Sequence, residues 1–333
     1  MISAFVVLDA STLDEDKQIE STEAEAAPQQ ELTIRVPASI GNFGPGFETV
    51  ALAVKLYMML KVRVRAPRQG SGIEISTRGP IAEQLALDSS NLISKVMEQS
   101  WPQDNRLLSC LSVLIDTEIP ISSGLGSSAA ATAAGVTAAM ALSGMPLEKG
   151  AIFDKAAKIE GHPESACASV FGGFTICAPG SSINDLIPRK LVWPEKWVLI
   201  AVVPPYKLQP KKARSVLPQS VSHKDAVINV QRVALLIEAV AAGDDEAMKA
   251  ALRDKLHEPY RSKLVPELAE LRKLLLEFDV LGSVLSGSGP TVVTVLDRKN
   301  EAPTLERLRQ WSTSNHCQIM QLEVDDEGLV AAN

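Results

Sequence analysis

The chain has 333 residues, 46 % hydrophobic and 22 % charged, a composition typical of a soluble globular protein of one or two domains. Its net charge of −7 argues against nucleic-acid binding, which needs a basic surface, although loop amides or a metal can still attract an anion. No apolar run reaches the roughly 18 residues that cross a bilayer, and no convincing secretory signal is seen, so no membrane contact and a cytoplasmic location are expected. The four cysteines and four histidines are scattered, which predicts buried free thiols rather than a metal cage.

The first half of the chain predicts an extension followed by strands and one buried helix. Residues 1–30 are acidic over most of their length and lack an apolar period, which predicts a disordered acidic extension. Alternating apolar residues predict strands from residue 31 onward, the first of them ending in a loop from Pro37 to Gly46. The other predicted elements of this half are strands at 56–64, 73–77 and 111–117 and a helix of small residues at 127–142.

The second half mixes both kinds of element again. Apolar spacing predicts helices at 151–160, 228–241 and 266–278, and strands at 174–177, 198–203 and 320–324, with a strand–glycine loop–strand unit at 284–296. The segment 178–196 is rich in Pro, Gly and Ser and indicates a domain boundary. Because strict βαβ repetition is absent, we expect an α+β fold, and we see no internal repeat.

The strongest local pattern is the loop Pro120-Ile-Ser-Ser-Gly-Leu-Gly-Ser-Ser-Ala-Ala130, which lies between a predicted strand and a predicted helix. Glycines let the backbone approach a ligand, and the free N–H groups of a helix start attract anions. A serine N-cap on a tight turn is the alternative, which the coincidence of two glycines and four serines disfavours. The residues predicted to bind phosphate are Pro120, Ser122, Ser123, Gly124, Leu125, Gly126, Ser127 and Ser128.

Other phosphate-binding signatures do not fit this loop. No Gly-Lys-Ser/Thr follows, as a Walker A loop requires, and the third glycine of a dinucleotide fingerprint is missing. The His-Arg-Asp and Asp-Phe-Gly signatures of protein kinases are absent as well. The loop instead resembles the second motif of the GHMP kinases, Pro-x-x-x-Gly-Leu-Gly-Ser-Ser-Ala-Ala, which wraps the phosphates of ATP while a serine contacts Mg²⁺. By this resemblance Ser127 or Ser128 would be a metal ligand.

Two further segments resemble the first and third motifs of that family, in the family's order. They are Pro37-Ala-Ser-Ile-Gly-Asn-Phe-Gly-Pro-Gly-Phe-Glu48 and Leu285-Ser-Gly-Ser-Gly-Pro-Thr291. The resemblance spans about residues 31–325 and implies that the third-motif loop packs beside the phosphate loop. The third-motif residues are Ser286, Gly287, Ser288 and Gly289.

The resemblance also implies a fold. It predicts a two-domain GHMP kinase architecture, with an ATP-binding domain at 31–185 that contains a left-handed βαβ unit and a ferredoxin-like domain at 186–333. The active site would lie between the two domains. Many members are homodimers, so a homodimer is a further expectation, although no pattern in this chain indicates one.

Within the superfamily, the chain is most similar to the homoserine kinases. Three segments carry this similarity: Ala213-Arg-Ser-Val-Leu-Pro218, Asp254-Lys-Leu-His-Glu-Pro-Tyr-Arg261 and Glu160-Gly-His-Pro-Glu-Ser165. The similarity implies Mg·ATP-dependent phosphorylation of the L-homoserine hydroxyl to O-phospho-L-homoserine, a step of threonine biosynthesis, with Glu160 as the carboxylate ligand of Mg²⁺. The residues that it assigns to the amino-acid substrate are Asn42, Glu48, His162, Glu164, Ser165, Arg214 and Arg261.

Several positions of the expected substrate pocket depart from the family pattern. Glu48 stands in place of Asp, Glu164 and Ser165 in place of Asp-Asn, and Pro210 where a threonine is frequent. These changes could compensate one another, change the acceptor or weaken the enzyme. The alternatives are therefore a GHMP kinase for another small hydroxylated metabolite, or a non-catalytic nucleotide-binding regulator. Direct attack by the substrate hydroxyl is the family expectation, and Glu48 or Glu164 as a base is a weaker hypothesis.

Overall fold

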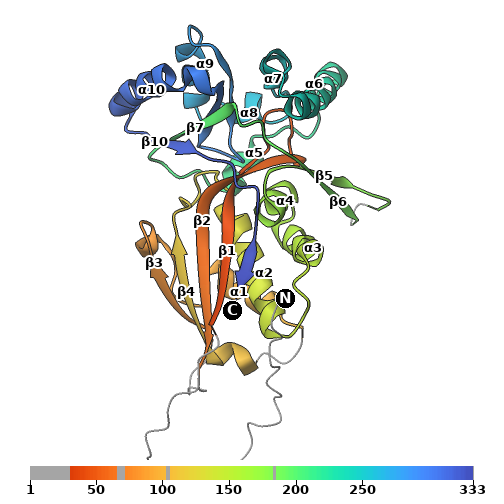
Figure 1. The fold of residues 1–333 in the computed structure, drawn as a ribbon, viewed down its shortest axis with the longest axis vertical. Helices are drawn as coiled ribbons and strands as arrows, with labels where there is room; N and C mark the ends of the chain where they lie inside the picture. The colour runs from red at the N-terminus through yellow and green to blue at the C-terminus, as the bar shows by residue number, and fades with distance from the viewer. Residues whose placement is uncertain (1–30, 66–71, 103–105, 183–184, 333) are drawn as a thin grey trace, which may run out of the picture.

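The computed structural model of the protein describes residues 31–65, 72–102, 106–182 and 185–332. The predicted acidic extension, residues 1–30, lies outside the described residues. A larger sheet and a smaller sheet, each with its own helices, follow one another along the long axis of the molecule (Figure 1). The mixture of helices and sheets confirms the α+β class. No helix in the described part of the chain is long and apolar enough to cross a membrane.

The larger sheet has seven strands and is mostly antiparallel. Its order is β11-β1-β2-β4-β3, and β5 pairs with both β2 and β6. Among the described strands only β3 and β4 run parallel, and helix α1 (Leu92–Ser100) lies between them in the chain, which gives a βαβ unit. The strands are β1 Glu31–Gly41, β2 Val50–Val64, β3 Glu74–Arg78, β4 Leu111–Thr117, β5 Phe174–Pro179, β6 Leu186–Leu191 and β11 Val330–Ala332.

The smaller sheet is antiparallel throughout, with the order β10-β7-β9-β8. Along the chain β7 is followed by helices, then β8, β9, α10 and β10, which is the ferredoxin-like arrangement that the family resemblance predicts. The strands are β7 Trp197–Val203, β8 Val280–Leu285, β9 Val292–Asp297 and β10 Gln318–Leu322. The helices of this part are α5 Pro210–Ser215, α6 His223–Ala242, α7 Asp245–Ala251, α8 Glu258–Arg261, α9 Glu267–Leu274 and α10 Glu301–Asn315.

Two strands beyond residue 185 belong to the larger sheet. The strand β6 pairs with β5, and the C-terminal strand β11 returns to pair with β1. The sequence boundary between 185 and 186 therefore stays a prediction, since hydrogen bonding joins segments on both sides of it.

The first strand is longer than the sequence predicts. β1 continues past Pro37 to Gly41, so the prediction of a loop from Pro37 is wrong for its first residues. Pro37 lacks an N–H, and the register of β1 against β2 shifts between Pro37 and Ala38, which lets the strand pass the proline. The end of the strand therefore places Gly41 and Asn42 at the junction with the smaller sheet, where both bond to Gly287.

Helix α2 (Ser127–Leu142) consists mostly of residues with small side chains. Its residues from Ala129 to Ala141 are all buried, and it packs against β1 and β2 as well as α1 and α3 (Lys149–Glu160). At Gly135 a Cβ atom would lie 2.8 Å from a side-chain atom of Val96, so α1 approaches closely only because the residue is glycine. This dense packing fixes the N-terminus of α2, where the predicted phosphate loop ends.

Candidate active site between the two sheets

The loop between β4 and α2 has a backbone that L side chains adopt with difficulty. Gly124 has φ = 94° and Gly126, the N-cap of α2, has φ = 73°, both in the left-handed region. A Cβ atom at Gly124 would lie 2.4 Å from the carbonyl oxygen of Ser286, and one at Gly126 would lie 2.1 Å from Ser39 Oγ. The two glycines are therefore required both by conformation and by close contact with the other two motifs.

Hydrogen bonds join the three motif loops, which lie far apart in the sequence. Ser286 Oγ donates to the carbonyl of Gly124 at 2.8 Å, and the N–H of Gly287 donates to the carbonyl of Gly41 at 2.7 Å. The amide of Asn42 spans the junction, because its Nδ2 donates to Gly287 O at 3.2 Å and its Oδ1 accepts from the Glu48 N–H at 2.7 Å. The third-motif loop thus lies directly beside the predicted phosphate loop.

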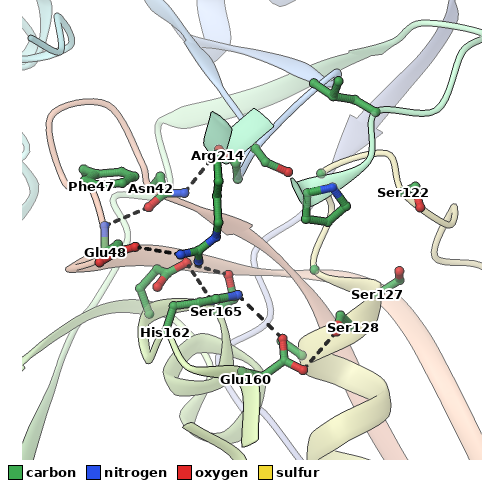
Figure 2. A pocket seen from close by; sticks show the side chains of 18 of the residues that line it. Asn42, Phe47, Glu48, Ser122, Ser127, Ser128, Glu160, His162, Ser165 and Arg214 are labelled. Atoms are coloured by element: carbon green, nitrogen blue, oxygen red, sulfur yellow. Dashed lines mark hydrogen bonds and ion pairs between the residues drawn. The ribbon is translucent and has the colours of Figure 1, made fainter. Parts of the chain in front are cut away.

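One cavity of about 400 Å³ lies where these loops meet (Figure 2). Its wall combines residues of the larger sheet's part with residues that follow β7, so both halves of the molecule form it. The predicted site residues on this wall are Asn42, Glu48, Ser122, Gly124, Gly126, Ser127, Ser128, Glu160, His162, Glu164, Ser165, Arg214, Arg261, Gly287 and Ser288.

Five residues of the predicted set do not line the cavity: Pro120, Ser123, Leu125, Ser286 and Gly289. The hydroxyl of Ser123 donates to the carbonyl of Pro120 at 2.8 Å, and the Leu125 side chain is fully buried. The side chains of Ser123 and Leu125 therefore shape the loop and do not reach the cavity.

A charged cluster occupies the end of the cavity away from α2. Arg214, on α5, places Nη1 3.5 Å from Glu48 Oε1, and Figure 2 shows the two side chains pointing toward one another. Glu164 begins helix α4 (Glu164–Phe171) and is only 3 % exposed, and its Oε1 lies 3.5 Å from His162 Nδ1. The carboxylate of Glu164 raises the pKa of His162, while burial opposes this shift. Burial alone would raise the pKa of Glu164, but His162 outweighs it and the pKa is lowered.

Glu160, at the C-terminus of α3, lies between this cluster and the start of α2. Its Oε1 accepts hydrogen bonds from Ser128 Oγ at 2.9 Å and Thr132 Oγ1 at 2.5 Å, and its Oε2 lies 3.9 Å from His162 Nε2. Figure 2 shows the Glu160 carboxylate turned toward Ser128, with Ser127 next along the helix start. A carboxylate and two serine hydroxyls within one turn of a helix N-terminus form an oxygen-rich set of the kind that Mg²⁺ prefers.

Arg261, on α8, is almost completely buried. Burial lowers the pKa of Arg261 to about 10, and the nearby Arg214 guanidinium adds to this effect. At neutral pH Arg261 therefore remains a cation, which lies at the wall of the cavity beside Arg214. Two adjacent guanidinium groups provide the charge and planar geometry that bind a carboxylate or phosphate.

A second cavity of about 250 Å³ adjoins the first and shares Leu92, Ser122, Ser127 and Ser128 with it. Its remaining wall is mainly apolar, with Met58, Ile81, Leu85, Ile93, Ile115, Ile119, Ile121 and Ala131 among its residues. This cavity could not be predicted from the sequence, because its residues come from separate elements and form no local motif. Thr132, which holds Glu160, was also missed, since a threonine inside a helix of small residues gives no distinctive pattern.

Comparison with known proteins identifies the family of the chain. The family model of the N-terminal domain of GHMP kinases matches residues 91–173, and that of their C-terminal domain matches residues 236–313. A homoserine kinase of Deinococcus radiodurans is 34 % identical over 92 % of this chain and 98 % of its own length. A homoserine kinase of Caldicellulosiruptor saccharolyticus is 33 % identical over 89 % of this chain and 95 % of its own length.

A solved structure shows the same fold. The crystal structure of homoserine kinase from Cytophaga hutchinsonii superimposes with a TM-score of 0.76 at 22 % identity, and covers 95 % of this chain and 100 % of its own. The sequence relatives extend over nearly the whole described chain, and the two sheets match the two-domain GHMP kinase architecture. The chain therefore belongs to the homoserine kinase family of the GHMP kinases.

Proposed function

We propose that the protein transfers the γ-phosphoryl group of ATP to the hydroxyl of L-homoserine, producing O-phospho-L-homoserine and ADP. Its family makes it an ATP-dependent small-molecule kinase. The observation that carries the choice of acceptor is the charged end of the cavity. Arg214, Arg261, Glu48 and Glu164 line this end. The start of α2 lines the same cavity of about 400 Å³.

The phosphates of ATP fit the start of α2. Gly126 and the first helical residues, Ser127 to Ala129, line the cavity, and the helix dipole places partial positive charge at this end. The adjoining apolar cavity has the volume and character to take the flat base of the nucleotide. Ser122, Ser127 and Ser128 line both cavities and so connect the two parts of the nucleotide site.

The oxygen atoms of Ser127, Ser128 and Glu160 suit a hard divalent cation such as Mg²⁺. Glu160 is already held by Ser128 and Thr132, so its carboxylate is oriented before a metal binds. When bound, Mg²⁺ would neutralise charge on the β- and γ-phosphates. The residues of this chain would hold the metal and the phosphates at the same helix start.

The amino-acid acceptor fits between the arginines and the acidic residues. Its carboxylate would pair with Arg214 and Arg261, and its ammonium group with Glu48 or Glu164. Glu164 Oε2 is buried and has no hydrogen-bond partner among the described residues, so a bound ammonium or hydroxyl group would satisfy it. This orientation directs the side-chain hydroxyl of the acceptor toward the phosphate loop.

In the reaction, the acceptor oxygen forms a bond to the γ-phosphorus while the bond from that phosphorus to the bridging oxygen of ADP breaks. The hydroxyl proton passes to an oxygen of the transferring phosphoryl group, and from there to water, as the new phosphate ester forms. Catalysis of this kind depends mainly on positioning and on charge stabilisation, which the arginines and the helix start provide. Direct attack needs no protein base, and Glu48 and Glu164 are the carboxylates that line this end of the cavity for the weaker alternative of base catalysis.

The test measures ADP release by the purified protein with Mg·ATP and a panel of acceptors: L-homoserine, L-serine, L-threonine, mevalonate and galactose. The proposal predicts the largest kcat/KM for L-homoserine. Preference for mevalonate or a sugar would make the protein a kinase for another acceptor. ATP binding without stimulation by any acceptor would indicate a nucleotide-binding regulator, and either result would contradict the proposal.

A further inference from the structure

His257 is a fully buried residue that neither the cavity wall nor the phosphoryl-transfer step accounts for. It is the N-cap of α8, four residues before Arg261. Asp254 fixes its backbone, because Asp254 Oδ2 accepts hydrogen bonds from the N–H groups of Leu256, His257 and Glu258 at 2.9, 2.6 and 2.7 Å. These three hydrogen bonds fix the segment of backbone from which the imidazole projects.

Both ring nitrogens of His257 have partners, and these partners determine its tautomer. Nε2 lies 3.2 Å from the carbonyl oxygen of Gly44 and 3.9 Å from Asp254 Oδ1, and both of these atoms are acceptors. Nδ1 lies 3.2 Å from Nη1 of Arg261, which can only donate. Only the neutral ring with its proton on Nε2 satisfies both contacts.

The same contact occupies one edge of the Arg261 guanidinium. Nε donates to the carbonyl of Ala213 at 3.3 Å, and Nη1 donates to the carbonyl of Gly287 at 3.1 Å. His257 Nδ1 takes the second proton of Nη1, so that three of the five N–H groups are used by the protein. Among the described residues Nη2 takes part in no hydrogen bond, and Arg261 lines the cavity, so its two remaining protons are available to a ligand.

Phe47 completes this arrangement. Its ring is stacked on His257 with a centroid distance of 5.3 Å and an interplanar angle of 22°, and Arg261 Cζ lies 5.4 Å from the same ring centroid. Gly44 and Phe47 belong to the turn of the first motif, whereas Arg261 belongs to the other half of the molecule. His257 therefore connects that turn to the guanidinium.

We propose that His257 is a positioning residue, whose Nδ1 holds the guanidinium of Arg261 so that Nη2 faces the acceptor, while Nε2 ties it to the Gly44 turn. This inference rests on the proposed function for the identity of the acceptor. It assigns to His257 an effect on acceptor binding that a purely structural core residue would lack.

Two conservative substitutions separate the two nitrogens. In His257→Asn, the amide oxygen takes the place of Nδ1 and keeps an acceptor for Arg261. In His257→Gln, the amide nitrogen takes the place of Nε2 and keeps the donor to Gly44. We expect His257→Gln to raise KM for L-homoserine about tenfold, and His257→Asn to stay within about threefold of the original enzyme. KM for ATP should change little in either variant. Equal values of KM for L-homoserine in the two variants would contradict the proposal.

A second measurement does not depend on catalysis. A double-mutant cycle with His257→Gln and Arg261→Lys on the unfolding equilibrium should show coupling equivalent to about a tenfold change in the equilibrium constant. Strict additivity would contradict the contact. Lack of L-homoserine-stimulated ADP release by the unsubstituted protein contradicts the proposed function, whereas additivity in the cycle contradicts only the role of His257.

Discussion

Arg214 Nη1 and Glu48 Oε1 lie 3.5 Å apart, so that an ion pair at the wall of the cavity joins α5 to the turn between β1 and β2. Both side chains are about half exposed, which makes the pair weak as a source of stability. The pair instead orients the Arg214 guanidinium, which stays half exposed beside Arg261 on the cavity wall. A carboxylate that enters the cavity can therefore compete with Glu48 for Arg214.

This relationship predicts that Arg214→Gln weakens acceptor binding. Loss of a charge-assisted hydrogen bond of about 1.5–3 kcal/mol should raise KM for L-homoserine about 10- to 100-fold, with little change in KM for ATP. Steady-state kinetics with each substrate varied in turn provides the measurement. Arg307→Gln, on an exposed position of α10, is the matched control and should leave both constants unchanged. An equal rise of both KM values in Arg214→Gln would argue against a specific role in acceptor binding.

The phosphate loop should not accept a side chain at Gly124. In Gly124→Ala the new methyl group would lie 2.4 Å from Ser286 O, in a residue whose φ of 94° is already unfavourable for alanine. We expect kcat/KM to fall at least about 100-fold, because a displacement of about 1 Å at reacting groups has effects of that size. The control is Gly150→Ala, where a Cβ atom meets nothing within 4 Å and φ is ordinary. Comparable activity in both variants would show that the close approach is unimportant.

Glu160 should determine the dependence on Mg²⁺. In Glu160→Gln one negative charge is lost while the hydrogen bonds to Ser128 and Thr132 can be retained through the amide oxygen. We expect the Mg²⁺ concentration for half-maximal activity to rise about tenfold or more, because second-shell partners alone change metal affinity 10- to 100-fold. A titration of activity against Mg²⁺ at saturating ATP measures this effect. An unchanged half-maximal concentration would remove Glu160 from the metal site.

We expect the His162–Glu164 pair to stabilise the fold within a limited range of pH. The pKa of His162 is raised in the folded protein, so its contribution is present below the unfolded value of about 6.5 and is lost as pH rises through the higher folded pKa. The pKa of Glu164 is lowered, so its contribution is present above its unfolded value and is lost as pH falls through the lower folded pKa.

Urea unfolding of the original protein and of His162→Gln, measured from pH 5 to pH 9 in steps, should therefore show the largest difference near pH 5 to 6 and a smaller one at about pH 9. The control His223→Gln, which changes an exposed side chain at the start of α6, should alter the free energy of unfolding less than His162→Gln does at pH 5 to 6. If the difference for His162→Gln grew with rising pH, the direction of the pKa shift would be wrong.

The sequence predicted those features that depend on short local patterns. The strand before the phosphate loop, the small-residue helix after it and the α+β class follow from periodicity and from the spacing of glycines. The helices α1 and α4 and the edge strand β6 were missed, because their apolar residues make too short a period to stand out. β11 was missed for the same reason, since only three residues pair with β1.

Side-chain contacts across long separations could not be predicted in this way. The Ser123 side chain belongs to a phosphate-loop motif, yet its hydroxyl bonds within the loop and does not reach the cavity. His257 appeared only as one letter of the segment around Arg261, and its partner Gly44 is 213 residues away. Such contacts depend on how the tertiary fold brings distant segments of the chain together.

The sequence by itself determined the kind of chemistry, because loops that bind phosphate need glycines and hydroxyls at fixed local spacing, and a helix start follows directly from that pattern. The tertiary structure decided which groups share one cavity. Arg214, Arg261, Glu48 and Glu164 come from different elements on both sides of the junction between the sheets, and only packing of those elements brings their charges together. Hydrogen bonds such as Asn42 to Gly287, between residues 245 positions apart, hold that junction closed.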